Sequence, residues 1–151
     1  MSIPRIDYSK GNYWMYKEVF SPTVWNMVLA LDNEKMAILG ALNLPQLSYL
    51  EACKIRNSEA YSTENAKAIF DHYAEFDSVK GPEVSNSRYI TEDVPEGLVL
   101  LESLGLSLDV PTPVCSALIT IASAFLQTDF REIGRTIEKL GKEELRMLME
   151  N

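Results

Sequence analysis

Apolar side chains recur every three to four residues along much of the chain, which is the spacing of an amphipathic helix. The longest such pattern lies between Ser21 and Pro45 and consists of Val24, Met27, Val28, Leu31, Ile38, Leu39 and Leu42. This pattern predicts a long helix that begins at Pro22, with Ser21 as its N-cap, and ends before Pro45.

Two shorter segments of the first half also have helical spacing. The first covers residues 47–56, and the second runs to about Phe76 after Ser62 or Thr63, either of which can act as its N-cap. Residues 1–20 carry a cluster of aromatic side chains without a clean period. This arm is therefore predicted to be irregular or a short helix packed on the rest of the protein.

The second half contains the two most apolar segments. They run from Asp93 to about Leu108 and from Val114 to Leu126, and both are apolar on almost every side. A helix of that kind is buried, so the two segments are predicted to form the central pair of the core. Thr112 is the expected N-cap of the second helix, with Pro113 as its first residue.

The C-terminal part of the chain contains two further helix signals. Asp129 and Glu132 have the spacing of a capping box, and the helix that they start ends at Gly141. Residues 142–150 form a last amphipathic segment. No run of alternating apolar and polar residues occurs, so no strand is predicted. The predicted fold class is all-α: one compact bundle of about six to seven helices in a single domain over residues 1–151.

Two sets of small polar side chains are interpreted as structural. Cys53 and Cys115 lie in different predicted helices without a metal-type spacing, so both are expected to be buried thiols in a reducing cytoplasm rather than a disulfide. Ser116, Thr120 and Ser123 form a stripe of hydroxyls on one helix face. Close helix packing, with the hydroxyls bonded back to their own turn, is favoured over substrate contact.

The most informative candidate site is an arginine and a carboxylate at the expected start of the first central helix. Asp93 is the predicted N-cap, Pro95 lies in the first turn, and Glu96 completes the spacing of a capping box. Arg88 lies five residues earlier, at the end of the longest predicted loop, residues 78–87. The helix is expected to open into the body of the protein, with Arg88 pointing into the same opening. The two residues are either a structural ion pair or half of an active site.

The charge balance narrows the possible partners. The chain has 151 residues, of which 46 % are hydrophobic and 24 % charged, with a net charge of −8. An acidic chain without a basic stripe is not expected to bind nucleic acid or an anionic membrane. No signal peptide is recognised at the N-terminus, and the longest apolar run, residues 114–126, is too short to span a bilayer.

Several segments of the chain resemble one family of proteins. The most specific is Arg88-Tyr89-Ile90-Thr91-Glu92-Asp93-Val94-Pro95-Glu96-Gly97-Leu98-Val99, followed by Ser103-Leu104-Gly105, Val110-Pro111-Thr112-Pro113, Asp129-Phe130-Arg131 and Gly134-Arg135-Thr136-Ile137-Glu138-Lys139-Leu140-Gly141. The early segments Arg5-Ile6-Asp7-Tyr8, Lys10-Gly11, Tyr16, Ser21-Pro22-Thr23-Val24 and Leu31-Asp32-Asn33-Glu34 are also similar. Together they resemble the C-terminal helical domain of the NAD(P)-dependent opine dehydrogenases, the octopine/nopaline dehydrogenase family.

This resemblance implies a fold and a reaction. The fold would resemble the helical C-terminal domain of 6-phosphogluconate dehydrogenase. The reaction joins an amino acid and a 2-oxo acid through an imine, which NADH or NADPH reduces. In that family a carboxylate orients a catalytic histidine, and an arginine binds a substrate carboxylate. Asp93 falls on the catalytic carboxylate position and Arg88 on the substrate-binding position. At a helix N-terminus, Asp93 is expected to stay ionised, because the backbone N–H groups favour its charge.

The departures from the family pattern are equally informative. No Gly-x-Gly-x-x-Gly follows a strand, so the dinucleotide-binding domain of the family is missing from the sequence, and neither NAD nor NADP is expected to bind this chain. The family's histidine should precede Arg5, whereas the only histidine is His72, interpreted as an ordinary boundary residue. The isolated chain is therefore expected to be inactive.

The sequence also fits a second function. A non-catalytic helical module for self-association or small-carboxylate binding would explain the same residues, and a homodimer is possible under both hypotheses. A missing domain should leave an exposed apolar patch near the N-terminal arm, whereas a free-standing module should not.

Overall fold

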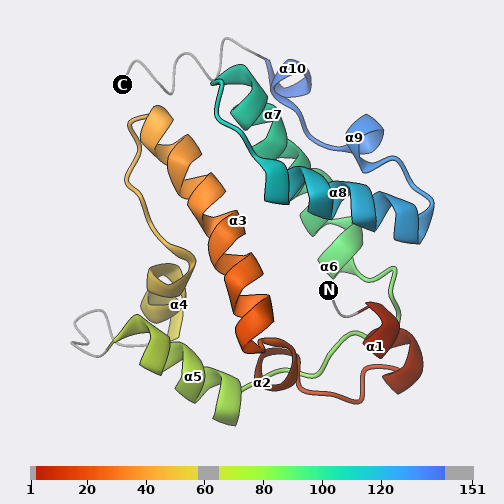
Figure 1. Ribbon diagram of the computed structural model, residues 1–151. Helices are drawn as coiled ribbons and strands as arrows, with labels where there is room; N and C mark the ends of the chain where they lie inside the picture. The colour runs from red at the N-terminus through yellow and green to blue at the C-terminus, as the bar shows by residue number, and fades with distance from the viewer. Residues whose placement is uncertain (1–2, 58–64, 142–151) are drawn as a thin grey trace. The chain divides into compact units, whose positions relative to one another are not determined.

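The computed structural model describes residues 3–57 and 65–141, and every regular element among them is a helix (Figure 1), which confirms the predicted all-α class. The elements are α1 (Ile3–Ser9), α2 (Met15–Val19), α3 (Pro22–Ala41), α4 (Tyr49–Asn57), α5 (Ala66–Phe76), α6 (Arg88–Thr91), the π-helical turn η1 (Asp93–Leu98), α7 (Val99–Ser107), α8 (Pro113–Leu126), α9 (Phe130–Ile133) and α10 (Ile137–Leu140). The predicted last helix, residues 142–150, lies outside the described residues.

The long helix of the first half begins where the sequence predicts. Pro22 is the first residue of α3, and the Ser21 hydroxyl accepts a hydrogen bond from the Val24 N–H at 3.4 Å, as expected of an N-cap. The cap of α5 was predicted one turn too early. Ser62 and Thr63 lie outside the described residues, and Asn65 caps the helix instead, accepting from the backbone N–H groups of its first turn.

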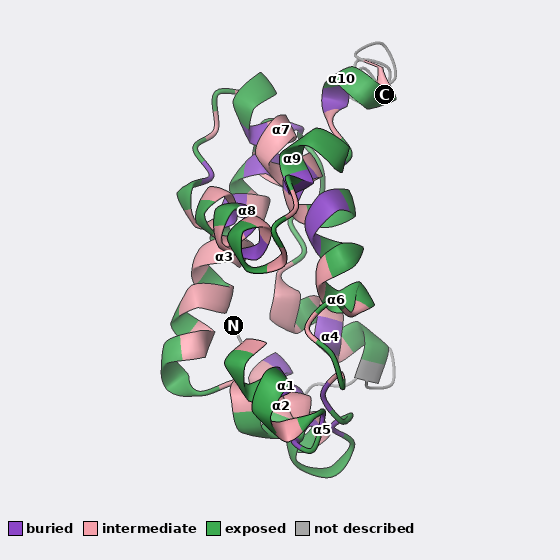
Figure 2. Ribbon diagram, turned by 90° about the vertical axis from the view of Figure 1, so that its right-hand side faces the viewer, coloured by how far each residue is buried: buried purple, intermediate pink, exposed green. Residues whose placement is uncertain are grey.

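The chain divides into two units by its contacts, and α3 contributes to both. The first unit consists of Met1–Asp32 and Leu47–Ser85, and the second of Asn33–Gln46 and Asn86–Asn151. Buried residues, purple in Figure 2, occur in both units.

The core of the first unit is a cluster of aromatic rings around Phe70. The buried centre is Phe70 with Cys53 and Ala74, and the partly buried residues packed against it are Tyr16, Phe20, Trp25, Tyr49 and Leu50. The Trp25 and Phe70 ring centroids are 4.8 Å apart in an edge-to-face arrangement. Aromatic side chains bury large areas and prefer this geometry, so Tyr16 and Phe20 of the arm belong to the core.

The arm is held against the loop that follows α5. The Tyr13 carbonyl accepts from the Gly81 N–H at 3.0 Å, and the Met15 N–H donates to the Val79 carbonyl at 2.8 Å. The Tyr13 ring lies so close to Gly81 that a Cβ there would be 2.1 Å from the ring. Only glycine therefore allows this contact. The arm contains the two short helices α1 and α2, in agreement with the expectation of irregular or short helical structure.

The second unit is built around α7 and α8. Its buried residues are aliphatic for the most part: Ile38, Leu42, Val94, Val99, Cys115, Ile119, Ala122, Phe130 and Ile137. Thr112 makes no capping hydrogen bond, contrary to prediction. Instead Glu34, from α3, accepts from the backbone N–H groups of Val114 at 2.7 Å and Cys115 at 2.9 Å. A carboxylate supplied from another helix satisfies the exposed donors of α8.

The predicted helix from Asp129 to Gly141 is divided. Asp129 caps α9 as expected, but the chain extends at Gly134 and starts again as α10, with Thr136 as a new cap. A Cβ at Gly134 would be 2.5 Å from the Phe130 carbonyl oxygen and 2.8 Å from the Val99 side chain. The close approach to α7 therefore interrupts the helix. Gly141 ends α10 at a φ of 99°, as predicted.

The structural interpretation of the small polar side chains is confirmed for the two thiols and in part for the hydroxyls, of which Thr120 bonds back to its own turn. Cys53 and Cys115 are buried free thiols. Thr120 donates back to the Ser116 carbonyl at 2.9 Å, whereas the Ser123 hydroxyl accepts from the Phe130 N–H at the start of α9. Both hydroxyls thus serve local structure.

Within the described residues, no single helix is long and apolar enough to cross a membrane. One pair of helical segments, Pro113–Leu126 and Phe130–Leu140, reaches the required length and composition only when taken together, and the two are bent by 108°.

Candidate active site

The helix that carries Asp93 begins earlier than the sequence indicates. Arg88 is the first residue of α6 rather than part of the approaching loop, and Asp93 lies inside the helical segment as the first residue of η1. The prediction that Asp93 is the N-cap is therefore wrong, and Glu92, which precedes η1, makes no side-chain cap either. Pro95 explains why the helix starts before Asp93. It is not a first-turn proline, because the helix accommodates it by widening into a π turn.

The π turn leaves one backbone carbonyl free. The Val99 N–H donates to the Val94 carbonyl, five residues back, instead of to Pro95. The Pro95 carbonyl instead accepts from the Arg135 N–H at 2.9 Å. The backbone of Arg135 is thereby anchored next to Asp93, although the two residues are far apart in sequence.

These residues line a shallow hollow of about 660 Å³ whose walls are Glu92, Asp93, Glu96, Gly97 and Arg135. The guanidinium of Arg135 is paired with Glu96 at 2.5 Å, and both side chains are about half exposed. The hollow therefore contains three carboxylates and one arginine from the described residues.

The Asp93 carboxylate has no hydrogen-bond donor among the described residues. Partial burial, which penalises the charged form, raises the pKa of Asp93, and the nearby positive charge of Arg88 opposes this effect. The reason expected for Asp93 staying ionised, a place at the helix N-terminus, does not apply, because the residue lies within the helical segment. Asp93 lines the hollow and is exposed to solvent there.

Arg88 lies at the surface near this hollow. Its guanidinium is 3.5 Å from Glu92, one helical turn later, and the two side chains are 74 % and 59 % exposed. Arg88 does not point into an opening in the protein body, as was expected, but lies exposed at the surface. An exposed pair of this kind contributes little to stability, so Arg88 can exchange its partner easily.

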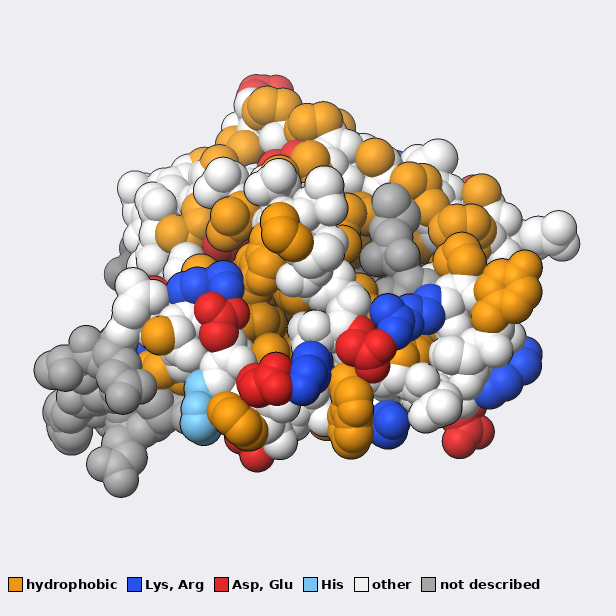
Figure 3. All heavy atoms as spheres, turned by 60° about the horizontal axis from the view of Figure 1, so that its bottom comes forward, with side chains coloured by type: hydrophobic (Ala, Val, Ile, Leu, Met, Phe, Trp, Pro, Cys, Tyr) orange, Lys and Arg blue, Asp and Glu red, His pale blue; other side chains and the backbone are white. Residues whose placement is uncertain are grey.

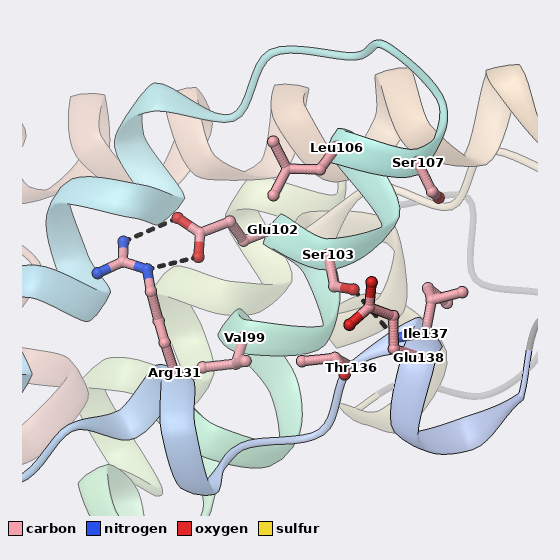
Figure 4. Close-up of a pocket in the computed structure, with 9 residues that line it drawn as sticks. All are labelled: Val99, Glu102, Ser103, Leu106, Ser107, Arg131, Thr136, Ile137 and Glu138. Carbon is pink, nitrogen blue, oxygen red and sulfur yellow. Dashed lines mark hydrogen bonds and ion pairs between the residues drawn. The ribbon is translucent and has the colours of Figure 1, made fainter.

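A second cavity, of about 400 Å³, lies between α7 and the α9–α10 region (Figure 4). Arg131 and Glu102 face each other there, with nitrogen–oxygen distances of 2.7 and 2.8 Å. Arg131 also donates to the Thr120 hydroxyl and the Ser116 carbonyl. These bonds hold the pKa of Glu102 below its usual value. Four hydrogen bonds from the Arg131 guanidinium tie α7, α8 and α9 together, so the cluster is structural.

The described residues contain no strand, and the sequence contains no glycine-rich turn of the kind that receives the pyrophosphate of a dinucleotide between a strand and a helix. Nor do the described residues contain a group of three or more His, Cys, Asp or Glu side chains that could hold a metal ion. His72 is exposed on α5, with its ring centroid 4.8 Å from that of Phe76.

Three residues that line the hollow or cap a helix were not identified from the sequence. Arg135 belongs to the Gly-Arg-Thr segment noted above, but only the π turn brings it to Asp93. Glu96 was assigned to a capping box and instead pairs with Arg135. Glu34 caps a helix 80 residues away in sequence, a contact for which periodicity carries no signal.

Comparisons with known proteins identify the family of the chain. Residues 1–126 match the family described as NAD/NADP octopine/nopaline dehydrogenase, alpha-helical domain. Similar curated proteins include the opine dehydrogenase of Arthrobacter sp. (strain 1C), 38 % identical over 129 residues, which are 83 % of this chain and 34 % of the relative. The vitopine synthase of Allorhizobium ampelinum is 29 % identical over 126 residues, and Protein ocs of Agrobacterium tumefaciens (strain Ach5) 27 % over 124 residues.

The aligned segments represent 83 and 82 % of this chain and 34 % of each of these two relatives. The chain thus spans about a third of the length of the curated relatives that it matches. Because the match to the helical domain covers most of the sequence, the chain belongs to the octopine/nopaline dehydrogenase family and corresponds to its α-helical domain.

Proposed function

We propose that this chain is the substrate-binding helical part of an opine dehydrogenase, which joins an amino acid and a 2-oxo acid in an NAD(P)H-dependent reductive condensation. The observation that carries the proposal is the Asp93 carboxylate, which lines a hollow beside Arg88 without a hydrogen-bond donor among the described residues. The nicotinamide supplies the hydride from a part of the enzyme that the described residues cannot form.

Asp93 is suited to position a histidine. A partly desolvated carboxylate interacts strongly with a neighbouring imidazolium, because the ion pair replaces the hydration that the carboxylate has lost. Pairing would lower the pKa of Asp93 and raise that of the histidine, which then holds the proton needed at the imine or carbonyl. The histidine would come from outside these residues.

Arg88 is suited to bind a substrate carboxylate. Its planar guanidinium can form two parallel hydrogen bonds with a carboxylate, which a single exposed contact to Glu92 at 3.5 Å does not use. Exchanging Glu92 for a substrate carboxylate therefore replaces a weak contact by a stronger one. Since the chain has a net charge of −8, binding depends on such local cations rather than on long-range attraction.

Exposed aromatic side chains on the arm support the presence of a covering domain. Tyr8 and Trp14 are exposed, as are Val79 and Val84 in the segment that pairs with the arm. Figure 3 shows a face on which apolar side chains lie between oppositely charged ones. Exposed apolar surface of this kind marks an interaction site more often than bare solvent contact.

The full-length opine dehydrogenase of Arthrobacter provides the test, through replacement of its residue at the position of Asp93 by asparagine. We expect this replacement to lower kcat by about 10²- to 10⁴-fold and to remove the limb of the pH profile that reports the histidine. Normal turnover by this variant would refute the role of Asp93. Circular dichroism and melting of Asp93→Asn in the present chain control for folding. These 151 residues alone are proposed to be inactive.

A further inference from the structure

The hollow at Asp93 is lined by an arginine and a glycine that the proposed function does not use. We propose that Arg135 binds the second carboxylate of the secondary-amine dicarboxylate, and that Gly97 keeps the surface beside Arg135 open for this group. The inference rests on the proposed function, which makes the ligand a dicarboxylate with one carboxylate on Arg88.

Arg135 is fixed in place through its backbone while its side chain is free to exchange partners. Its N–H donates to the Pro95 carbonyl at 2.9 Å, whereas its guanidinium makes one contact, at 2.5 Å, with Glu96. The two side chains are 48 % and 51 % exposed. An exposed pair of this kind is held weakly, so a ligand carboxylate can replace Glu96 and use both arms of the guanidinium.

The two arginines of this surface are presented in the same way. Arg88 is held by Glu92 and Arg135 by Glu96, and these glutamates are one helical turn apart on the same segment. Asp93 lies next to Glu92 on that segment. A ligand with two carboxylates around a central nitrogen matches two exchangeable guanidinium groups near a single unpartnered carboxylate.

Gly97 has no conformational or packing reason to be glycine. Its φ is not positive, and a Cβ built there would meet nothing within 4 Å. Glycine inside a helical segment lowers helix stability relative to alanine, so its presence on the wall of the hollow needs another explanation. Open space for a bound group beside Arg135 provides one.

The test is a titration of the uniformly ¹⁵N-labelled 151-residue chain followed by NMR. The probe is iminodiacetate, a secondary amine with two carboxylates, and the matched control ligand is N-methylglycine, which has one. We expect iminodiacetate to shift the Gly97 amide and Arg135 Nε signals saturably. Arg135→Gln should weaken its binding about tenfold, Arg135→Lys should restore part of the loss, and Glu96→Gln should strengthen binding about threefold by releasing Arg135.

The opposite signs of the two variants distinguish ligand binding from a structural ion pair. If Arg135 and Glu96 served only stability, removing either partner would change binding in the same direction or not at all, and that result would overturn the proposal. Gly97→Leu fills the hollow with a good helix former. It should weaken the binding of iminodiacetate while leaving the melting temperature at or above that of the wild type.

The remaining outcomes separate this inference from the proposed function. If Arg88→Gln weakens binding of both ligands but Arg135→Gln weakens neither, Arg88 keeps its role and the assignment of Arg135 is wrong. If iminodiacetate produces no saturable shift at Gly97 or Arg135, the second carboxylate site does not exist. Turnover of the full-length relative after replacement of its residue at the position of Asp93 is measured separately and is independent of both results.

Discussion

Two arginines four residues apart in sequence form ion pairs of opposite character. Arg131 contacts Glu102 through two nitrogen atoms and also donates to Thr120 and Ser116, and only 12 % of the Glu102 side chain is exposed (Figure 4). Arg135 makes one contact with Glu96, and that carboxylate is 51 % exposed. The same pair of side-chain types is thus fixed in one region and exchangeable in the other.

The difference shows that charge alone does not identify a binding arginine. What distinguishes the two is how many of the guanidinium donors are already used, and whether the partner carboxylate has lost its hydration. The cluster of Arg131 has few unused donors, whereas Arg135 keeps most of its own. Arg131 is therefore assigned to the scaffold and Arg135 to the ligand.

The largest expected effect comes from breaking the fixed pair. Arg131→Ala leaves Glu102 buried without its partner, and we expect the free energy of unfolding to fall by about 2 kcal/mol, since the pair is only partly buried. Urea denaturation followed by circular dichroism measures this loss. Arg135→Ala is the matched control and should change stability by less than about 0.5 kcal/mol. Equal losses in both variants would contradict the comparison.

Replacing a glycine by alanine should also affect stability differently in the two regions. Gly134→Ala places a Cβ 2.5 Å from the Phe130 carbonyl oxygen and 2.8 Å from Val99, so we expect a loss of about 1–2 kcal/mol from overpacking. Its melting temperature should fall accordingly in differential scanning calorimetry.

Gly97→Ala, in the hollow, is expected to have the opposite sign. Its Cβ meets nothing within 4 Å, so alanine should raise the free energy of unfolding by about 0.5–1 kcal/mol through helix propensity. The same calorimetric measurement applies. A destabilised Gly97→Ala protein would show that this glycine has a structural purpose after all.

The stability of the two regions should depend on pH with opposite signs, because the pKa of Glu102 is lowered and the pKa of Asp93 is raised. The pKa of Glu102 is lowered, chiefly by its hydrogen bonds to Arg131, so its stabilising contribution is present above the unfolded pKa and is lost as the pH falls through the folded pKa. We expect Glu102→Gln to flatten the loss of stability below about pH 4.5, by roughly half a kcal/mol. An unchanged acid slope would contradict this.

Asp93 should give the smallest effect and the reverse sign. Its pKa is raised by partial burial, so any stability that it contributes is present at low pH and is lost as the pH rises through the folded pKa. At pH 7, Asp93→Asn should therefore leave stability unchanged or raise it by less than about 0.5 kcal/mol, as measured by urea denaturation. A clear loss of stability would indicate a structural role in place of the functional one.

Local signals in the sequence were sufficient for most helices. Pro22 after Ser21, Pro113 at the start of α8 and Gly141 at the end of α10 lie where the sequence predicts, because each acts on its own turn of backbone. The apolar character of the α7 and α8 segments likewise identified the core of the second unit.

Contacts between distant segments could not be predicted in this way. The cap of α8 comes from Glu34, the interruption at Gly134 comes from its approach to Val99, and Arg135 reaches Asp93 because the Pro95 carbonyl is free. Each depends on tertiary packing, which periodicity does not encode. The residues of the candidate site were named from family resemblance, whereas the capping argument placed Asp93 one helical turn too close to the start of its helix.

The π turn contains one residue more than an α-helical turn would need at this place. Deleting one residue from Asp93–Leu98 would return the Val99 N–H to a partner four positions back, occupy the carbonyl that now holds Arg135, and rotate the preceding side chains by about 100° around the helix axis. A single codon thus separates a surface with two usable guanidinium groups from an ordinary helix. In alignments of related sequences, the length of this segment will therefore be as informative as the identity of its residues.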